Sequence, residues 1–172
     1  MYALTQIIGA HGVRRGEKAM TFRFLDDFDY IPGYEVDLLI DRHVPDDPAK
    51  GWVPAYKYHV ALHNSSTIVG RIDLRIGDQE SLYYVGHIGF AIQEAYRGRH
   101  FAAQACQLLK PLALAHEMTA LSITCSPTNK PSRKTCEYVG ATLKSIVTLP
   151  THHGLFQRGE RQLCVYEWIL AP

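Results

Sequence analysis

Residues 87–105 read HIGFAIQEAYRGRHFAAQA and combine the end of a strand with the start of a helix. Large apolar residues alternate with small ones before the turn, and apolar residues recur at helical spacing after it. The turn carries Arg97, Gly98 and Arg99. A helix N-terminus exposes unpaired N–H groups and the positive end of the helix dipole, so it binds phosphate groups well. The stretch therefore predicts an anion site, with a solvated, arginine-rich helix start as the alternative.

The rest of the chain alternates between strand and helix patterns in a definite order. The expected strands are residues 36–41, 56–63, 68–76, 81–92, 120–125, 143–149 and 162–170. The expected helices cover about 100–117, kinked at Pro111, and 129–139, closed by Gly140. This order predicts one α/β domain over residues 1–172, an α+β sandwich on a mixed sheet.

The N-terminal extension, residues 1–33, has no clear pattern. Its phenylalanines Phe22, Phe24 and Phe28 stand among acidic residues and are consistent with a strand or with a lid over the site.

Composition excludes several classes of function. The net charge is +1, which gives no global attraction to nucleic acid, and no apolar stretch is long enough to cross a membrane. Four widely spaced cysteines form no Cys-x-x-Cys pair, and the histidines have no metal-ligand spacing, so we expect neither a metal site nor a disulfide framework. No signal peptide is recognisable, and a cytoplasmic protein is predicted.

A second motif follows the expected helix and strand. Asn129, Ser132, Glu137 and Gly140 stand in the pattern N-x-x-S-x-x-x-x-E-x-x-G. Together with the turn, this block resembles the GNAT acetyltransferases, nearest to uncharacterised members similar to the ribosomal-protein N-acetyltransferases. The resemblance covers residues 56–170.

The resemblance implies a mixed, mostly antiparallel sheet flanked by helices and acetyl-coenzyme A (acetyl-CoA) as cofactor. In the family motif R/Q-x-x-G-x-G/A, Arg97 and Ala102 match the first and last positions. His100 replaces the middle glycine, so either it avoids a positive φ or the loop is reshaped. Family members usually place two helices between the first two strands, and the dozen residues available here cannot form them.

The resemblance also implies which residues hold the cofactor. They are Phe90, Ala91, Ile92, Arg97, Gly98, Arg99, His100, Phe101, Ala102, Asn129 and Arg133. A family bulge near Gly89 aims an N–H group at the thioester carbonyl, although this glycine also suits close helix packing. Lys130, Arg133 and Lys134 form a basic cluster that suits the 3′-phosphate or is simply solvated.

Three residues are the main candidates for proton transfer. His87 stands where relatives often carry glutamate and could be the general base, or a hydrogen-bonded core residue; Glu80 is a weaker candidate. Ser132 matches the serine proposed as proton donor in the ribosomal-protein branch, and Cys136 lies on the same helix face. In the alternative, Asn129 and Ser132 only cap the helix.

The predicted function is N-acetyl transfer to a primary amine by direct attack in a ternary complex. A small-molecule amine and a protein N-terminus are both possible acceptors, and a homodimer is possible. The alternative is a domain of the same fold that binds acyl-CoA as a sensor or scaffold without turnover.

Overall fold

The computed structural model describes residues 22–78 and 82–170, which form one eight-stranded sheet. The strands lie in the order β1 (Tyr30–Ile31), β2 (Val36–Val44), β3 (Ala55–Leu62), β4 (Ile68–Arg75), β5 (Ile88–Ile92), β6 (Ala120–Cys125), β8 (Gln162–Ile169) and β7 (Thr142–Thr148). Every neighbouring pair is antiparallel except β5 and β6, which are parallel. The predicted mixed, mostly antiparallel sheet is confirmed.

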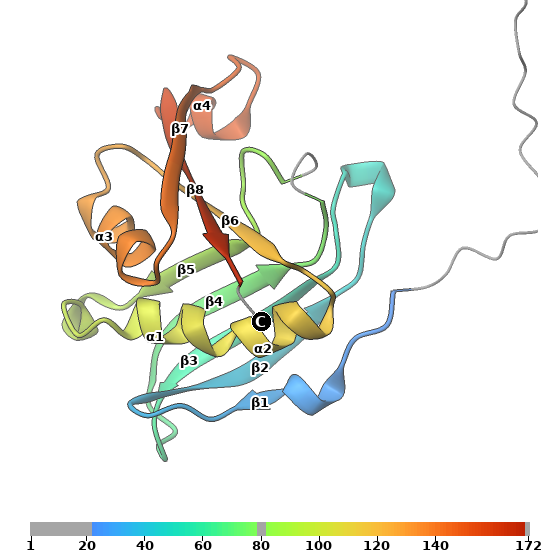
Figure 1. The fold of residues 1–172 in the computed structure, drawn as a ribbon, viewed down its shortest axis with the longest axis vertical. Coiled ribbons are helices and arrows are strands. Elements are labelled where there is room, and N and C mark those ends of the chain that lie inside the picture. Colours follow the sequence, from blue (N-terminus) through green and yellow to red (C-terminus); the bar gives the residue numbers. More distant parts are fainter. Residues whose placement is uncertain (1–21, 79–81, 171–172) are drawn as a thin grey trace, which may run out of the picture.

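Helices cover one face of this sheet. They are α1 (Phe101–Leu108), α2 (Lys110–Ala115) and α3 (Lys130–Tyr138). The short helix α4 (Gly154–Gln157) lies in the connection between β7 and β8, and three 3₁₀ turns are η1 (Asp26–Phe28), η2 (Pro48–Lys50) and η3 (Glu94–Tyr96). Figure 1 shows α1 and α2 lying across β2–β5. The alternation of each strand turns its apolar residues toward these helices: Tyr58, Ile72 and Phe90 are neighbours in register and pack with Leu109 and Leu112 in the core.

The prediction of one kinked helix over residues 100–117 is wrong. α1 ends at Leu108 and α2 begins at Lys110, with Leu109 between them. Pro111 lies in the first turn of α2, where its missing N–H costs nothing because that group has no intrahelical partner anyway. The proline therefore starts a new helix.

The expected strand over residues 81–92 is also shorter than predicted. Residue 81 lies outside the described part of the chain, and residues 82–85 form a turn in which Leu82 O accepts hydrogen bonds from Val85 N and Gly86 N. Gly86 has φ +71°, and a Cβ there would lie 3.0 Å from Ser122 O. Only glycine fits this position easily, and the strand begins two residues later at Ile88.

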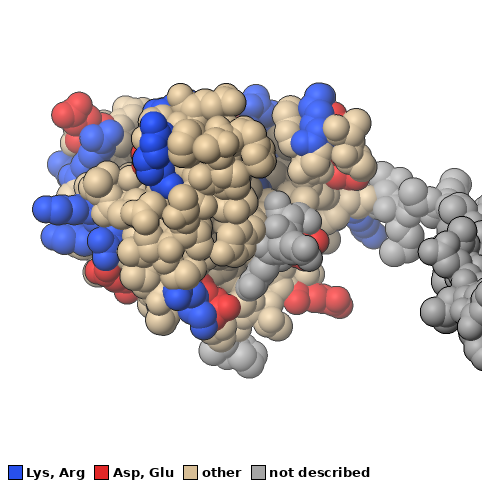
Figure 2. Space-filling model, turned by 90° about the horizontal axis from the view of Figure 1, so that it is seen from above, with Lys and Arg blue, Asp and Glu red and all other residues tan. Residues whose placement is uncertain are grey.

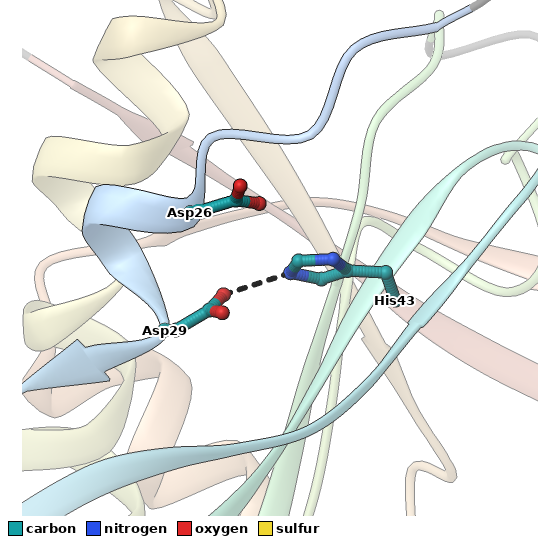
Figure 3. A group of neighbouring side chains, drawn as sticks. All are labelled: Asp26, Asp29 and His43. Carbon is teal, nitrogen blue, oxygen red and sulfur yellow. Dashed lines mark hydrogen bonds and ion pairs between the residues drawn. The ribbon is translucent and has the colours of Figure 1, made fainter.

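The segment from Phe22 to Ile31 packs against the end of the sheet. Phe22 and Phe24 lie in irregular structure and Phe28 in a 3₁₀ turn, so of the two alternatives the strand is wrong. The Phe24 ring stacks on His43 at 4.5 Å between centroids, and Tyr56 Oη accepts a hydrogen bond from Leu25 N at 2.8 Å. Figure 3 shows His43 beside Asp26 and Asp29, whose ligand atoms lie within 4.8 Å of one another. His43 Nε2 is 2.9 Å from Asp29 Oδ1, so these contacts fasten the segment to β2.

The connection between β2 and β3 holds only η2, in agreement with the predicted loss of the two family helices. Within residues 22–78 and 82–170, no helix has the length and apolar character needed to span a membrane.

Candidate functional site

Strands β5 and β6 separate soon after they meet. Their only register pair is Ile88 with Ile123, whereas β4 and β5 pair at five successive positions. Figure 1 shows the two strands diverging toward the side where α1 and α3 begin. The separation leaves an open edge along the second half of β5.

The backbone of Phe90 faces this gap. Arg75 N donates to His87 O and Gln93 N donates to Val69 O, so odd-numbered residues of β5 bond to β4. Because backbone groups alternate in direction along an antiparallel strand, Phe90 and Ile92 turn theirs toward β6. Ile92 O accepts from Arg97 Nε at 3.1 Å. The register is continuous from Gly70–Ile92 to Leu74–Ile88, so the expected bulge near Gly89 is absent from β5.

The side chains of this strand divide between two faces, as predicted. Phe90 and Ile92 pack against the core, while Ala91 is exposed on the opposite face. The residues predicted to bind the cofactor in β5 can therefore contact it through backbone groups rather than through large side chains.

The β5–α1 turn has an unusual backbone. Gly98 has φ +81° and His100 has φ +58°, the left-handed conformation. His100 does not avoid a positive φ: it adopts the conformation that the family glycine would supply. Its ring stacks on Tyr138 of α3 at 4.4 Å, a contact that offsets part of the backbone strain.

The start of α1 offers donors to an anion. The first intrahelical bond runs from Gln104 N to His100 O, and His100 makes no side-chain cap. The N–H groups of Phe101 and Ala102 precede this bond, and the buried Phe101 side chain leaves only its backbone for a ligand. Arg97 and Arg99 are exposed beside them. Figure 2 shows basic residues gathered on the left, the side on which α3 and this turn lie in Figure 1.

The start of α3 follows the end of β6, and α3 packs beside α1. Asn129 Oδ1 accepts a hydrogen bond from Ser132 N at 3.2 Å, so the capping role of Asn129 is confirmed. The Ser132 side chain is half-buried, and its hydroxyl bonds to none of the described residues. Arg133 Nε donates to Tyr166 Oη at 3.2 Å, so this guanidinium points inward. Arg133 is therefore not simply solvated.

Cys136 lies one turn further along α3 and is fully buried. A hydrogen bond to Cys125 and burial both raise the pKa of the Cys136 thiol, and the same hydrogen bond lowers the pKa of Cys125. Cys125 ends β6. The shared face of Ser132 and Cys136 is therefore directed at the end of β6, with Ser132 nearer the opening.

His87 is a core residue in this structure. Its side chain is 1% exposed, Nδ1 accepts from Ser122 N at 2.8 Å, and Nε2 donates to Gly77 O at 3.2 Å. Burial lowers the pKa of His87 below its ordinary value. With both ring nitrogens engaged, the geometry favours the hydrogen-bonded alternative over the general base. Glu80 lies outside the described residues.

This environment predicts an acid-sensitive fold. His87 binds a proton near pH 6.5 in the unfolded chain, whereas its pKa in the folded protein is lower. The contribution of His87 to the free energy of unfolding is therefore fully present above pH 6.5. It decreases as the pH falls below 6.5, by at most about 1.4 kcal/mol per pH unit. Urea unfolding of His87→Gln from pH 7.5 to pH 5 should show a flatter dependence than the wild type. The exposed His152→Gln should follow the wild type; parallel curves for all three proteins would contradict the prediction.

Two features were not predicted from the sequence. Asp73 on β4 is the register partner of Gly89 on β5. The sequence does not show that these two residues are neighbours, because the register of the strands is needed. A cavity of about 200 Å³ opens over β6, β7 and β8 beside His87; its lining consists of Tyr83, Ser122, Lys144, Ser145, Val165, Tyr166 and Glu167.

The family model of the acetyltransferase (GNAT) domain matches residues 19–142. No curated protein sequence matches the chain. Among solved structures, a GNAT-family acetyltransferase from Bacillus anthracis is 21% identical, with 66% of each chain aligned and a TM-score of 0.54. A probable GNAT-family acetyltransferase from Chromobacterium violaceum is 15% identical over 99% of this chain and 96% of its own, with a TM-score of 0.62.

RimL, the ribosomal L7/L12 α-N-protein acetyltransferase, has a structure with coenzyme A bound. It is 17% identical over 70% of this chain and 64% of its own, with a TM-score of 0.53. The chain therefore spans just under two thirds of RimL and of the Bacillus anthracis protein.

The matched family consists of acyltransferases whose donor is acetyl-CoA, which confirms the predicted enzyme class and cofactor. The strand order, the gap after Ile88 and the exposed start of α1 fit that cofactor. From the matched residues and the shared fold, the chain belongs to the GNAT acetyltransferase family.

Proposed function

We propose that the chain transfers the acetyl group of acetyl-CoA to a primary amine, by direct attack while both substrates are bound. The single observation that supports this best is the gap between β5 and β6, because it leads from the donors at the start of α1 to the backbone of Phe90, which faces the gap. Acetyl-CoA supplies the activated acetyl group when it is bound.

Different residues of this chain suit different parts of acetyl-CoA. The N–H groups at the start of α1, together with Arg97 and Arg99, suit the pyrophosphate. The backbone of Phe90 suits the amide groups of the pantetheine arm, and Asn129 and Ser132 flank its far end. Lys130 and Lys134, with Arg133 beside them, suit the 3′-phosphate at the edge of this site.

The acceptor enters from the face of the sheet that lacks α1–α3. This face is open at β3–β5 and carries the cavity of about 200 Å³ over β6–β8. RimL is named for acting on a protein N-terminus, so a peptide acceptor is one candidate, and a small amine is the other. Four free cysteines, all buried, suit the reducing cytoplasm that we retain as part of this proposal.

Thermal unfolding with acetyl-CoA tests the cofactor site. At a cofactor concentration 100 times its Kd, mass action should stabilise the fold by about 2.7 kcal/mol, while free acetate should not. The double variant Arg97→Ala, Arg99→Ala should need at least about tenfold more acetyl-CoA for the same shift, since each charged hydrogen bond contributes about 1.5–3 kcal/mol.

Absence of a shift at millimolar acetyl-CoA would contradict the cofactor site. A shift without transfer to any amine of a broad panel would instead support the sensor or scaffold alternative.

A further inference from the structure

One face of the sheet is left without a helix by α1, α2 and α3. These helices pack on the face that carries Ile72 and Leu74. The alternate residues of β3 and β4 point the other way, and their charged members are Lys57, Arg71, Asp73 and Arg75. This open face is the side from which an acceptor reaches the gap.

Asp73 lies against the backbone of β5 on this face. It is the register partner of Gly89, and a Cβ on residue 89 would lie 2.9 Å from Asp73 Oδ1 and 3.2 Å from Arg75 Nη2. Neighbouring strands are about 4.8 Å apart, and successive residues rise about 3.3 Å. The carboxylate is therefore within one residue of Phe90, whose backbone faces the gap.

One oxygen of the Asp73 carboxylate accepts no hydrogen bond from the described residues. Its Oδ2 atom is buried, and no described donor reaches it with hydrogen-bond geometry, although Arg75 Nη2 lies 2.7 Å away in an ion pair. Buried carboxylate oxygens normally accept hydrogen bonds. Burial raises the pKa of Asp73, against the opposing effect of Arg75, Lys57 and Arg71. Both features suit a group that takes a proton from a ligand.

The charges around Asp73 restrict what can bind there. Lys57 is its register partner on β3, Arg71 is exposed one position along the same face, and His87 lies beyond Arg75. Arg75 is held by the carbonyl groups of Val85 and Gly86. The three cations outnumber the single carboxylate. They lower the pKa of a nearby ammonium group, which aids its deprotonation, and they attract an anionic group.

We propose that Asp73 takes the proton of the acceptor's ammonium group, and that the acceptor is a primary amine with an anionic group close to it. The proposal rests on the acetyl transfer proposed above. The ammonium N–H bond breaks, and its proton passes to the Asp73 carboxylate, whose side chain is 21% exposed. The nitrogen–carbon bond then forms as the carbon–sulfur bond of the thioester breaks. The second amine proton goes to the departing sulfur, and Asp73 returns its proton to water. Arg71 and Lys57 hold the anionic group.

Matched dipeptides and carboxylate variants test this assignment. Transfer from acetyl-CoA to the dipeptides Ala-Glu, Ala-Gln and Ala-Lys is followed by thiol release across pH 5–9. The wild type should prefer Ala-Glu by at least about tenfold in kcat/KM over Ala-Lys, a difference of about 1.4 kcal/mol. Asp73→Asn should lower kcat/KM by about 10²-fold and remove the acidic limb of the pH profile.

Four control measurements separate proton transfer, acceptor binding and cofactor binding. Asp73→Glu should recover part of the rate, whereas Asp41→Asn, an ordinary carboxylate that lies 3.5 Å from exposed His59, should leave the rate unchanged. Arg71→Ala should abolish the preference for Ala-Glu. Asp73→Asn should still show the full thermal shift with acetyl-CoA.

Four other results would each contradict a different part of the inference. An unchanged rate or a persistent acidic limb in Asp73→Asn removes the proton-transfer role, and loss of the acetyl-CoA shift in that variant places Asp73 in the cofactor site instead. A wild type that binds acetyl-CoA but acetylates none of the dipeptides removes the acceptor class. A wild type that fails to bind acetyl-CoA removes the proposed function itself.

Discussion

Ser132→Ala should lower kcat for acetyl transfer by about 10²-fold while the Kd for acetyl-CoA stays nearly constant. The side chain of Ser132, in the first turn of α3, is half-buried, and its hydroxyl bonds to none of the described residues. It is therefore free to donate a hydrogen bond to a departing thiolate. An interaction made only as the sulfur departs affects kcat and leaves ground-state binding unchanged.

Cys136 provides the matched comparison, because sequence alone made it an equal candidate for the acid. Its thiol is fully buried and engaged with Cys125, so it cannot reach a ligand without moving. Cys136→Ala should therefore reduce stability by about 1 kcal/mol and change kcat less than about threefold. Ser132→Thr retains a hydroxyl and should recover part of the rate.

Stopped-flow thiol release and acetyl-CoA titration separate the two effects. A large loss of kcat in Cys136→Ala with an unchanged rate in Ser132→Ala would reverse the assignment. A rise in the Kd of Ser132→Ala would show instead that the hydroxyl binds the cofactor in the ground state.

The sequence predicts the periodic parts of the fold well, because alternation and turns are local signals. The strands at β3, β4, β6 and β8 and the helix at α3 appear close to their expected ranges. The errors fall where tertiary contacts decide. Pro111 starts a second helix, whose Leu112 packs in the core beside Leu109 from the junction, and Gly86 forms a turn because its backbone passes close to Ser122. Neither contact is encoded within a few neighbouring residues.

For the candidate site, too, local motifs are predicted from the sequence and long-range contacts are not. The turn at Gly98 and the cap at Asn129 are local motifs that the sequence identifies, although His100 in that turn adopts the positive φ that it was expected to avoid. The role of His87 depends on Ser122 and Gly77, which lie 35 and 10 residues away, and sequence left its two alternatives equal. Asp73 belongs to no sequence motif. It becomes a candidate only because the register of the sheet places it opposite Gly89.

Leu112→Ala should be among the most destabilising single substitutions in the chain, with a cost of about 3 kcal/mol. α2 has six residues, too few to be stable alone, so it depends on packing by Leu112 and Ala113, both fully buried. For a chain of this size, each kcal/mol lowers Tm by about 2–4 °C. Leu143→Ala is the matched control: the side chain is 39% exposed on β7, so the same substitution should cost less than about 1 kcal/mol.

The response of Leu112→Ala to acetyl-CoA then shows how far α2 supports the site. α2 follows α1 directly through Leu109, but the proposed cofactor donors lie at the opposite end of α1. Because the stabilisation by a ligand depends only on its concentration and Kd, an unchanged site requires the same gain in unfolding free energy in the variant as in the wild type. Equal costs for Leu112→Ala and Leu143→Ala would contradict the core position of Leu112. A smaller gain with acetyl-CoA in Leu112→Ala would mean that the packing of α2 also fixes the start of α1.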